Sequence, residues 1–206
     1  MEPRKLLEVL HVAQQLKDTT RHCYTAGGRH ESVAEHSWRA ALMAWLLRDE
    51  FPQADMDKVI HMCLVHDLGE AFTGDIPSFD KTEADESRED ALLQEWIASL
   101  PAPYAQELTA LCREMAARET LEAKIFKAID NLEAVIQHNE SDISTWIPLE
   151  YELNMTYAVD KVAFSPYLQA LRREMQADTL KKIAEEKAEK EKAEKEKAAE
   201  KTAEKA

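Results

Sequence analysis

Three observations predict an all-α protein. The chain of 206 residues has only 4 glycines and 7 prolines, too few for the many tight turns of a β-protein. Hydrophobic residues make up 45% of it, which is enough to build the core of one domain. These residues recur at spacings of three and four, the period of an amphipathic helix, and we find no strand pairing, Gly-rich phosphate loop or internal repeat.

The helical spacing defines seven segments. They are residues 6–16, 33–47, 56–68, 92–100, 108–115, 121–136 and 168–175. Start signals accompany three of them. Ser32 and Glu35 form a capping box, Asp55 can cap the third segment, and Ser165 precedes Pro166 at the start of the last. Breaks are expected at residues 27–28, 52, 74–77, 101–103 and 148.

The composition changes after Ile183. Residues 184–206 contain only Ala, Glu, Lys and one Thr, so this segment has no large apolar side chain with which to join a core. We therefore expect a domain over residues 1–183 and a low-complexity tail over residues 184–206. Good helix formers with interleaved charges favour an extended, solvated helix for the tail. A coiled coil is the alternative, but it needs larger apolar residues than Ala.

The net charge argues against one class of partner. The chain carries −14, and the tail, with eight Glu and seven Lys, accounts for −1, which leaves −13 on residues 1–183. Nucleic acid polymers are bound mainly through cationic contacts to many phosphates, so we expect no such partner. A single phosphate group can still be held by a metal ion and one or two arginines.

Compartment and membrane signals are consistent with each other. The longest apolar run, residues 40–47, is far shorter than the roughly 20 residues that span a bilayer, so no membrane partner is expected. The N-terminal residues carry charge where a signal peptide needs its apolar centre. Cys23, Cys63 and Cys112 are widely spaced and predict reduced thiols. We expect a cytoplasmic protein.

One histidine is followed directly by an aspartate. His66 and Asp67 lie near the end of the apolar segment 56–68, and Glu70 follows four positions after His66. A buried imidazole and acid need a partner, and a metal ion would satisfy both. On a helix Glu70 would lie about 6 Å along the axis from His66, next to such an ion. His36, in the first turn of its segment, can supply a third ligand, and Asp130, among apolar residues, a fourth.

These motifs together resemble the HD-domain superfamily of metal-dependent phosphohydrolases. Residues 29–36 (RHESVAEH) followed by residues 64–77 (LVHDLGEAFTGDIP) resemble its 5′-deoxynucleotidase branch, which hydrolyses deoxynucleoside 5′-monophosphates. The resemblance extends from about residue 6 to residue 164. It implies an HD-domain helical bundle, a small-molecule nucleotide substrate and a homodimer.

The resemblance also implies roles for individual residues. One divalent cation would be held by His36, His66, Asp67 and Asp130. Two imidazoles and two carboxylates suit Mn²⁺, Co²⁺, Fe²⁺ or Zn²⁺ and leave coordination positions open. Glu70 and Asp75 match acidic residues that position the attacking water or move its protons, and the sequence leaves open which is the base and which the acid.

Histidine count separates this chain from two-metal relatives. Two-metal phosphodiesterases and oxygenases of the superfamily take additional histidine ligands between the His-Asp pair and the last Asp, and residues 68–129 contain none. This favours a hydrolase with one metal ion. His61 and His138 lie outside that interval and are expected to be structural or surface residues.

Substrate contacts are expected from Arg21, His22 and Arg29, with Lys81 as a further candidate for phosphate. Where the resemblance places a tryptophan near the nucleoside, this chain has His22, and the alternative for His22 is a surface position.

The sequence is also compatible with two alternative functions. One is a phosphohydrolase that acts on a nucleoside triphosphate or a non-nucleotide monoester. The other is a scaffold of the same fold without catalysis.

Overall fold

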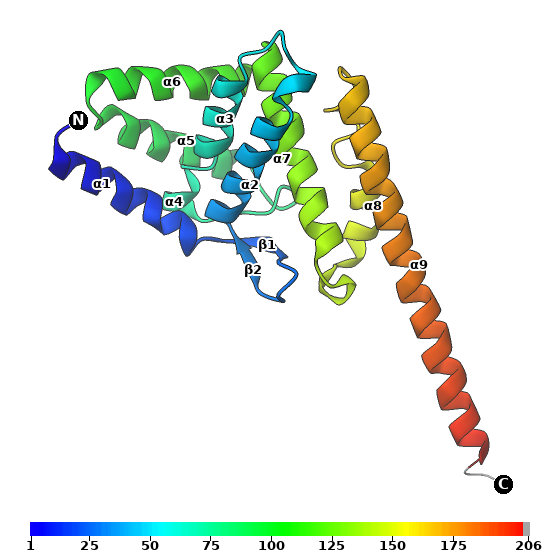
Figure 1. Cartoon of the computed structure of the whole chain (residues 1–206). Coiled ribbons are helices and arrows are strands. Elements are labelled where there is room, and N and C mark those ends of the chain that lie inside the picture. Colours follow the sequence, from blue (N-terminus) through cyan, green and yellow to red (C-terminus); the bar gives the residue numbers. More distant parts are fainter. Residues whose placement is uncertain (204–206) are drawn as a thin grey trace.

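The predicted all-α class is confirmed. The computed structural model describes residues 1–203, and over that range most of the chain is helical (Figure 1). Its helices are α1 (Pro3–Gln14), α2 (Val33–Leu46), α3 (Met56–Val65), α4 (Glu70–Thr73), α5 (Glu83–Ala98), α6 (Ala102–Ala117), α7 (Leu121–Glu140), α8 (Pro148–Thr156) and α9 (Pro166–Ala203). Short 3₁₀ turns cover Gln15–Lys17, Arg48–Glu50 and Ile143–Thr145.

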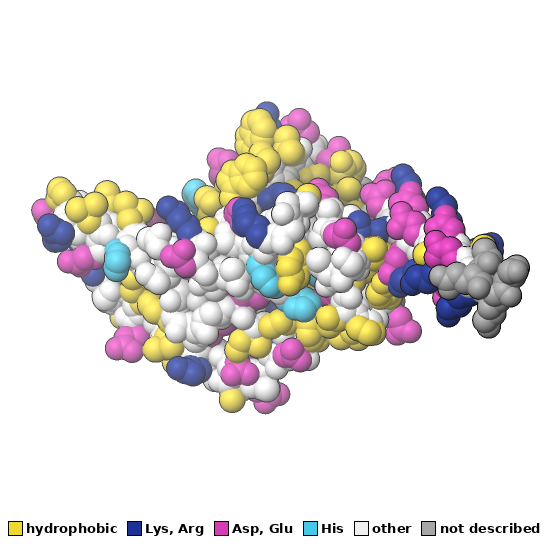
Figure 2. All heavy atoms as spheres, turned by 90° about the horizontal axis from the view of Figure 1, so that it is seen from below, with side chains coloured by type: hydrophobic (Ala, Val, Ile, Leu, Met, Phe, Trp, Pro, Cys, Tyr) yellow, Lys and Arg dark blue, Asp and Glu magenta, His cyan; other side chains and the backbone are white. Residues whose placement is uncertain are grey.

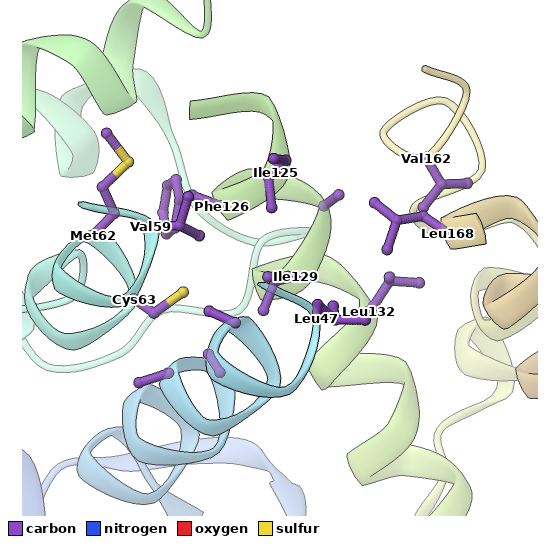
Figure 3. Packing of buried hydrophobic residues seen from close by; sticks show 14 of the residues in the cluster. Leu47, Val59, Met62, Cys63, Ile125, Phe126, Ile129, Leu132, Val162 and Leu168 are labelled. Atoms are coloured by element: carbon purple, nitrogen blue, oxygen red, sulfur yellow. The ribbon is translucent and has the colours of Figure 1, made fainter. Parts of the chain in front are cut away.

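Helix α7 lies at the centre of the core. Its apolar residues Ile125, Ile129 and Leu132 are fully buried. They pack against α2 and α3 on one side and against Val162 and Leu168, before and within α9, on the other (Figure 3). Burying each such side chain contributes roughly 1.5–3 kcal/mol. A polar residue on the α2-facing side of α7 is therefore held in a fixed position.

The expected capping residues form their hydrogen bonds. The Ser32 side chain accepts from the Glu35 N–H, and the Glu35 carboxylate returns a contact to the Ser32 N–H at 2.9 Å. Asp55 accepts from the Lys58 N–H at 3.0 Å. These bonds satisfy N–H groups that a helix start leaves without intrahelical partners. They fix the first turns of α2 and α3.

The expectation of no strand pairing was wrong. Strands β1 (Thr20–Tyr24) and β2 (His30–Ser32) form an antiparallel hairpin in which Thr20 pairs with Ser32 and Tyr24 with His30, with a register irregularity between. Gly28, at a φ of 80°, makes the left-handed turn of the connection. Strands of five and three residues are too short for an alternating pattern to show in the sequence. The hairpin leads directly into α2.

Several helix boundaries also differ from the sequence prediction. Helix α3 ends at Val65 and not at residue 68, so His66 is its C-cap. Helices α5 and α6 begin earlier than expected because their first turns are polar or exposed and lack the apolar spacing. Pro148, expected as a break, begins α8, since a helix's first turn does not need the proline N–H.

Helix α9 runs without interruption across residue 183. Its first half packs on the bundle through Leu168 and Met175, whereas residues 187–201 are exposed. The Tyr151 hydroxyl donates to the Glu186 carboxylate at 3.0 Å near the point where the helix leaves the body. This half projects from the body (Figure 1), and its described side chains on the face seen in Figure 2 are chiefly charged. None of the described helices is both long enough and apolar enough to cross a membrane.

Candidate active site

Four polar side chains from three parts of the chain converge in the bundle. His36 lies in the first turn of α2, His66 caps α3, Asp67 follows in the turn, and Asp130 lies in the middle of α7. The capping box positions His36, and the buried stripe of α7 positions Asp130. Because α2, α3 and α7 pack on one another, the three segments bring these residues to one point.

The distances between the donor atoms are short. His36 Nε2 lies 3.3 Å from His66 Nε2, 3.8 Å from Asp67 Oδ2 and 3.1 Å from Asp130 Oδ1. His66 Nε2 lies 3.0 Å from Asp67 Oδ2 and 3.5 Å from Asp130 Oδ1. Two imidazole nitrogens and two carboxylate oxygens therefore surround a common point. The structure brings together all four residues that the sequence singled out.

The Nδ1 atom of each imidazole, which faces away from the common point, contacts an oxygen atom of the protein. His66 Nδ1 donates to the Cys63 carbonyl at 2.9 Å, and His36 Nδ1 contacts the buried Glu133 carboxylate. With a proton on Nδ1, each ring turns the lone pair of Nε2 toward the shared point. Both histidines are thus arranged as a metal requires.

Electrostatics in the cluster favour a cation. Burial lowers the pKa of His66, but the Asp67 and Asp130 carboxylates outweigh it and raise that pKa to about 10. Burial opposes ionisation of Asp130, yet Lys127 and the imidazoles hold its pKa well below the usual range. The carboxylates therefore favour a positive charge at the point between them. A divalent cation can supply that charge, and the nitrogen and oxygen donor set fits such an ion.

Charged groups behind His36 hold its imidazole in place. Glu133 Oε1 accepts from Arg39 Nε at 2.6 Å, and Arg39 also reaches Glu140 and Gln137. Glu31, whose exposed fraction is 2%, lies 3.2 Å from Arg21 Nε. Glu31 and Glu133 form a further acidic group around His36, but arginines pair with both. We interpret this group as support for the imidazole.

A cavity of about 270 Å³ opens onto the four-residue cluster. Its lining includes Asp67 and Asp130 together with Glu70 and Asp75, the two acids expected to act on water. This volume lies near the small end of ligand pockets, which hold roughly 300–1,000 Å³. It fits one small molecule.

Glu70 and Asp75 have altered acidity. Burial, followed by the charges of Asp67 and Asp75, raises the pKa of Glu70 to about 10. Burial also raises the pKa of Asp75, which follows Gly74 in a turn with a φ of 79°. Glu70 Oε2 is buried and has no hydrogen-bond partner among the described residues. Two acids with raised pKa values in one cavity are typical of proton-transfer sites.

The expected substrate contacts divide into two groups. Arg21 lines the cavity, with its Nη1 3.8 Å from Asp67 Oδ2, and Lys81 lines it while bound to Glu89 at 2.7 Å. His22 also lines the cavity but pairs with Glu150. Arg29 differs. It is exposed, pairs with Glu35 and is not part of the cavity lining, so the structure does not bring it to the site.

Sequence reasoning missed three functional candidates on α7. Lys127 Nζ donates to Asp130 Oδ2 at 2.6 Å, Glu133 contacts His36, and His138, expected to be structural or at the surface, lines the cavity. His61 is exposed, as expected. A signal was present, since Lys127, Asp130 and Glu133 follow each other at spacings of three, and the other residues from 125 to 135 are apolar except Asn131.

The sequence is similar to a known protein family and to several of its characterised members. A family model described as an HD domain matches residues 13–172. The chain is 33% identical to the 5′-deoxynucleotidase HDDC2 of Homo sapiens over 141 residues, which are 66% of this chain and 68% of the human protein. It is 27% identical to the HDDC2 5′-deoxynucleotidase of Dictyostelium discoideum over 188 residues, 86% of this chain and 94% of that one.

Two solved structures are also similar. A protein described as a predicted metal-dependent phosphohydrolase, from Magnetospirillum magnetotacticum MS-1, aligns with a TM-score of 0.72 and 28% identity over 86% of this chain and 92% of its own. A conserved hypothetical protein from Pyrococcus furiosus aligns with a TM-score of 0.66 and 27% identity, covering 83% of this chain and 99% of its own.

Proposed function

This chain belongs to the HD-domain 5′-deoxynucleotidase family and is a phosphohydrolase, and from that premise we propose that it hydrolyses deoxynucleoside 5′-monophosphates to nucleoside and phosphate. The observation that carries the proposal is the convergence of His36, His66, Asp67 and Asp130 beside a cavity that also contains Glu70 and Asp75. The four converging residues would hold one divalent ion, and the two acids would serve the reaction.

The metal ion would supply two kinds of chemistry, polarisation of a phosphoryl oxygen and a lower pKa for a bound water. The protein supplies orientation. Glu133 and the Cys63 carbonyl hold the imidazoles with Nε2 facing inward, and Lys127 holds the Asp130 carboxylate from its second oxygen. These contacts keep the four donors in place before the substrate arrives, which reduces reorganisation during the reaction.

Glu70 and Asp75 would move the protons of the reaction. Hydrolysis of a phosphomonoester needs a base for the attacking water and an acid for the leaving 5′-oxygen. Both side chains line the cavity, and burial raises the pKa of each, to about 10 for Glu70. We assign the base and acid roles to this pair as a unit.

Cationic side chains would hold the phosphate. Arg21 contacts Asp67 across the cavity wall, and Lys127 and Lys81 also line the cavity. The planar fork of an arginine matches two phosphate oxygens, whereas lysine contributes a point charge. Three cations around one small cavity offset the acidity of the rest of the site and favour a doubly charged monoester over a neutral ligand.

The test of the proposed function is product analysis with a substrate panel. The purified chain with Mn²⁺ or Co²⁺ should release inorganic phosphate from dAMP and dTMP. Release of pyrophosphate or triphosphate from dATP as the main reaction would support another phosphohydrolase specificity, and so would preference for a sugar phosphate. An absence of turnover with all of them, while nucleotide still binds, would indicate a scaffold.

We also propose that the enzyme is a homodimer through one face of α2. Trp38, Leu42, Trp45 and Leu46 of that helix are all exposed, with 61% of Trp38 and 63% of Leu46 accessible. Residues 36–48 contain no acidic residue, in a chain with a net charge of −14. Two copies can therefore approach on this face without bringing carboxylates of residues 36–48 together, and the same patch would meet itself about a twofold axis.

The dimer is tested by sedimentation analysis. The natural chain should sediment as a dimer, and Trp45→Glu should convert it to a monomer without loss of helical content. A monomeric natural chain would contradict this part of the proposal.

We further propose a cytoplasmic location, because Cys23, Cys63 and Cys112 are all free and suit a reducing compartment.

A further inference from the structure

Helix α1 presents an apolar face that nothing in the described part of the chain covers. No residue of this 12-residue helix is buried, whereas α2, α3 and α7 each bury several. Leu6, Leu7 and Leu10 are exposed, with 46%, 56% and 54% of them accessible. A helix of this length is marginal in water unless tertiary contacts stabilise it. Helix α1 therefore lacks, within its own chain, the packing that stabilises the other helices.

The exposed leucines lie together on one side of α1, which we call the leucine face. At about 100° per residue, Leu6, Leu7 and Leu10 fall within roughly a third of the helix circumference, and the charged residues Arg4 and Glu8 fall outside it. The leucine face is therefore uncharged in a chain whose net charge is −14. A partner recognised by its charge finds no complementary group there, whereas a second copy brings no carboxylates together at this face.

The leucine face lies on the same side of the molecule as the exposed face of α2. Figure 2 shows hydrophobic side chains along the upper edge of the arm at the left, where α1 lies in Figure 1, and a second group on that side over the middle of the molecule, where α2 lies. The turn Gln15–Lys17, which continues α1, packs on α2. The two faces form one surface, which we call the α1–α2 surface. It consists of Leu6, Leu7 and Leu10 with Trp38, Leu42, Trp45 and Leu46.

Helix α2 alone is too small for a stable dimer interface. Such an interface buries roughly 800 Å² on each subunit and draws on about 20–30 residues a side. Helix α2 has 14 residues, and only the four apolar residues of its proposed dimer face are exposed. Helix α1 adjoins it and adds three exposed leucines. Its addition extends the apolar surface toward the area that a stable dimer needs.

We propose that the leucine face of α1 is the second half of the dimer interface, so that the α1–α2 surface packs on the same surface of a second copy of this chain. This inference rests on the proposed homodimer and is independent of the proposed reaction, since no residue of α1 lines the cavity. In a twofold dimer each contact occurs twice, so α1 is covered in both subunits. The second copy then supplies the packing that α1 lacks within its own chain.

The test measures the dimer dissociation constant by sedimentation equilibrium on the full-length chain. Leu10→Glu should raise that constant by at least about 100-fold, because each dimer would bury two unpaired carboxylates. The matched control is Leu180→Glu on α9, which lies on the other side of the molecule (Figure 1). Leu180 is 52% exposed, close to the value for Leu10, and its replacement should leave the constant unchanged.

Folding of the variants is checked on the same preparations. Glutamate is a good helix former, so circular dichroism of Leu10→Glu and Leu180→Glu should match that of the natural chain. An unchanged dissociation constant in a folded Leu10→Glu protein would overturn the inference.

Hydrogen exchange shows directly whether the second copy covers α1. In the natural dimer the backbone amides of residues 6–14 should exchange at least about tenfold more slowly than in the monomeric Trp45→Glu variant. The variant leaves α1 without the packing that holds its hydrogen bonds closed. Equal exchange in the two proteins would contradict the inference even if Leu10→Glu weakened the dimer.

Failure of the proposed dimer gives a different pattern. If Trp45→Glu dissociates the dimer and Leu10→Glu does not, the α2 interface stands and the role of α1 is wrong. If the natural chain is a monomer at every concentration, both proposals fail. If that monomer sediments with vesicles of phosphatidylcholine and phosphatidylserine, α1 covers a lipid surface, which also overturns this inference. Phosphate release from dAMP is measured separately and decides only the reaction.

Discussion

His36 and Glu133, which are 97 positions apart in the chain, meet in the core through His36 Nδ1 and a carboxylate oxygen of Glu133. Both side chains are fully buried. Arg39 donates to the other carboxylate oxygen at 2.6 Å and holds the Glu133 side chain in place. The pair determines which nitrogen of His36 faces the other three donors.

The first prediction concerns this pair. Glu133→Gln should weaken Mn²⁺ binding by about 10–100-fold, because the imidazole loses the carboxylate that orients it and makes it more basic. Calorimetric metal titration measures the effect without any substrate. Glu119→Gln, an exposed change just before α7, is the control and should bind as tightly as the natural chain. Unaltered affinity in Glu133→Gln would show that the contact is structural only.

Metal affinity should rise with pH. In the metal-free protein the Asp67 and Asp130 carboxylates raise the pKa of His66 to about 10, so this imidazole holds a proton at neutral pH. A metal ligand must be deprotonated, and binding therefore releases that proton. The dissociation constant for Mn²⁺ should fall by up to about tenfold for each pH unit between 6 and 8.5. A constant affinity over this range would contradict the assignment of His66.

Glu70→Gln should lower kcat by about 10²–10⁴-fold, which is the usual contribution of a general acid or base. The amide has nearly the shape of the acid but cannot exchange a proton at neutral pH. Mn²⁺ affinity should change little, because Glu70 is not one of the four converging residues. Phosphate release from dAMP and metal titration on the same preparation separate the two effects. Full activity would remove Glu70 from the mechanism.

Leu168→Ala should lower the free energy of unfolding by about 2–5 kcal/mol. Leu168 is fully buried against α7 although it lies near the start of the helix that leaves the body (Figure 3). Leu180→Ala on the same helix is the matched control, since 52% of Leu180 is exposed, and should cost less than about 0.5 kcal/mol. Denaturant unfolding followed by circular dichroism gives both values.

Removal of residues 184–206 should leave both kcat and the melting temperature nearly unchanged. Within the described part of this segment the charged side chains are mostly exposed, and pairs such as Lys192 and Glu196, at 4.0 Å, contribute little. The lost bond between Tyr151 and Glu186 is also partly exposed. A fall in melting temperature of more than a few degrees would show that the projecting half of α9 supports the bundle.

Much of the fold could be predicted from interactions between residues close together in the sequence. The helical spacing, the capping box at Ser32 and Glu35 and the cap at Asp55 are interactions within a few residues, so they can be recognised in the chain itself. The hairpin of residues 20–32 could not, because two short strands satisfy each other's hydrogen bonds across a turn and leave no repeat. The start of α5 was missed for a related reason, since its first turns are polar.

The sequence by itself determined the residue types for a metal site: His66 and Asp67 adjacent, His36 behind a capping box, and Asp130 among apolar residues. Tertiary structure alone decided which other side chains face them. It placed Glu133 on His36 and Lys127 on Asp130, put His138 in the cavity beside Glu150, and kept Arg29 outside it. The reason is physical. Contacts between distant segments depend on how helices pack. The burial that raises the pKa of Glu70 and the carboxylates that raise the pKa of His66 are in place only after the helices have packed.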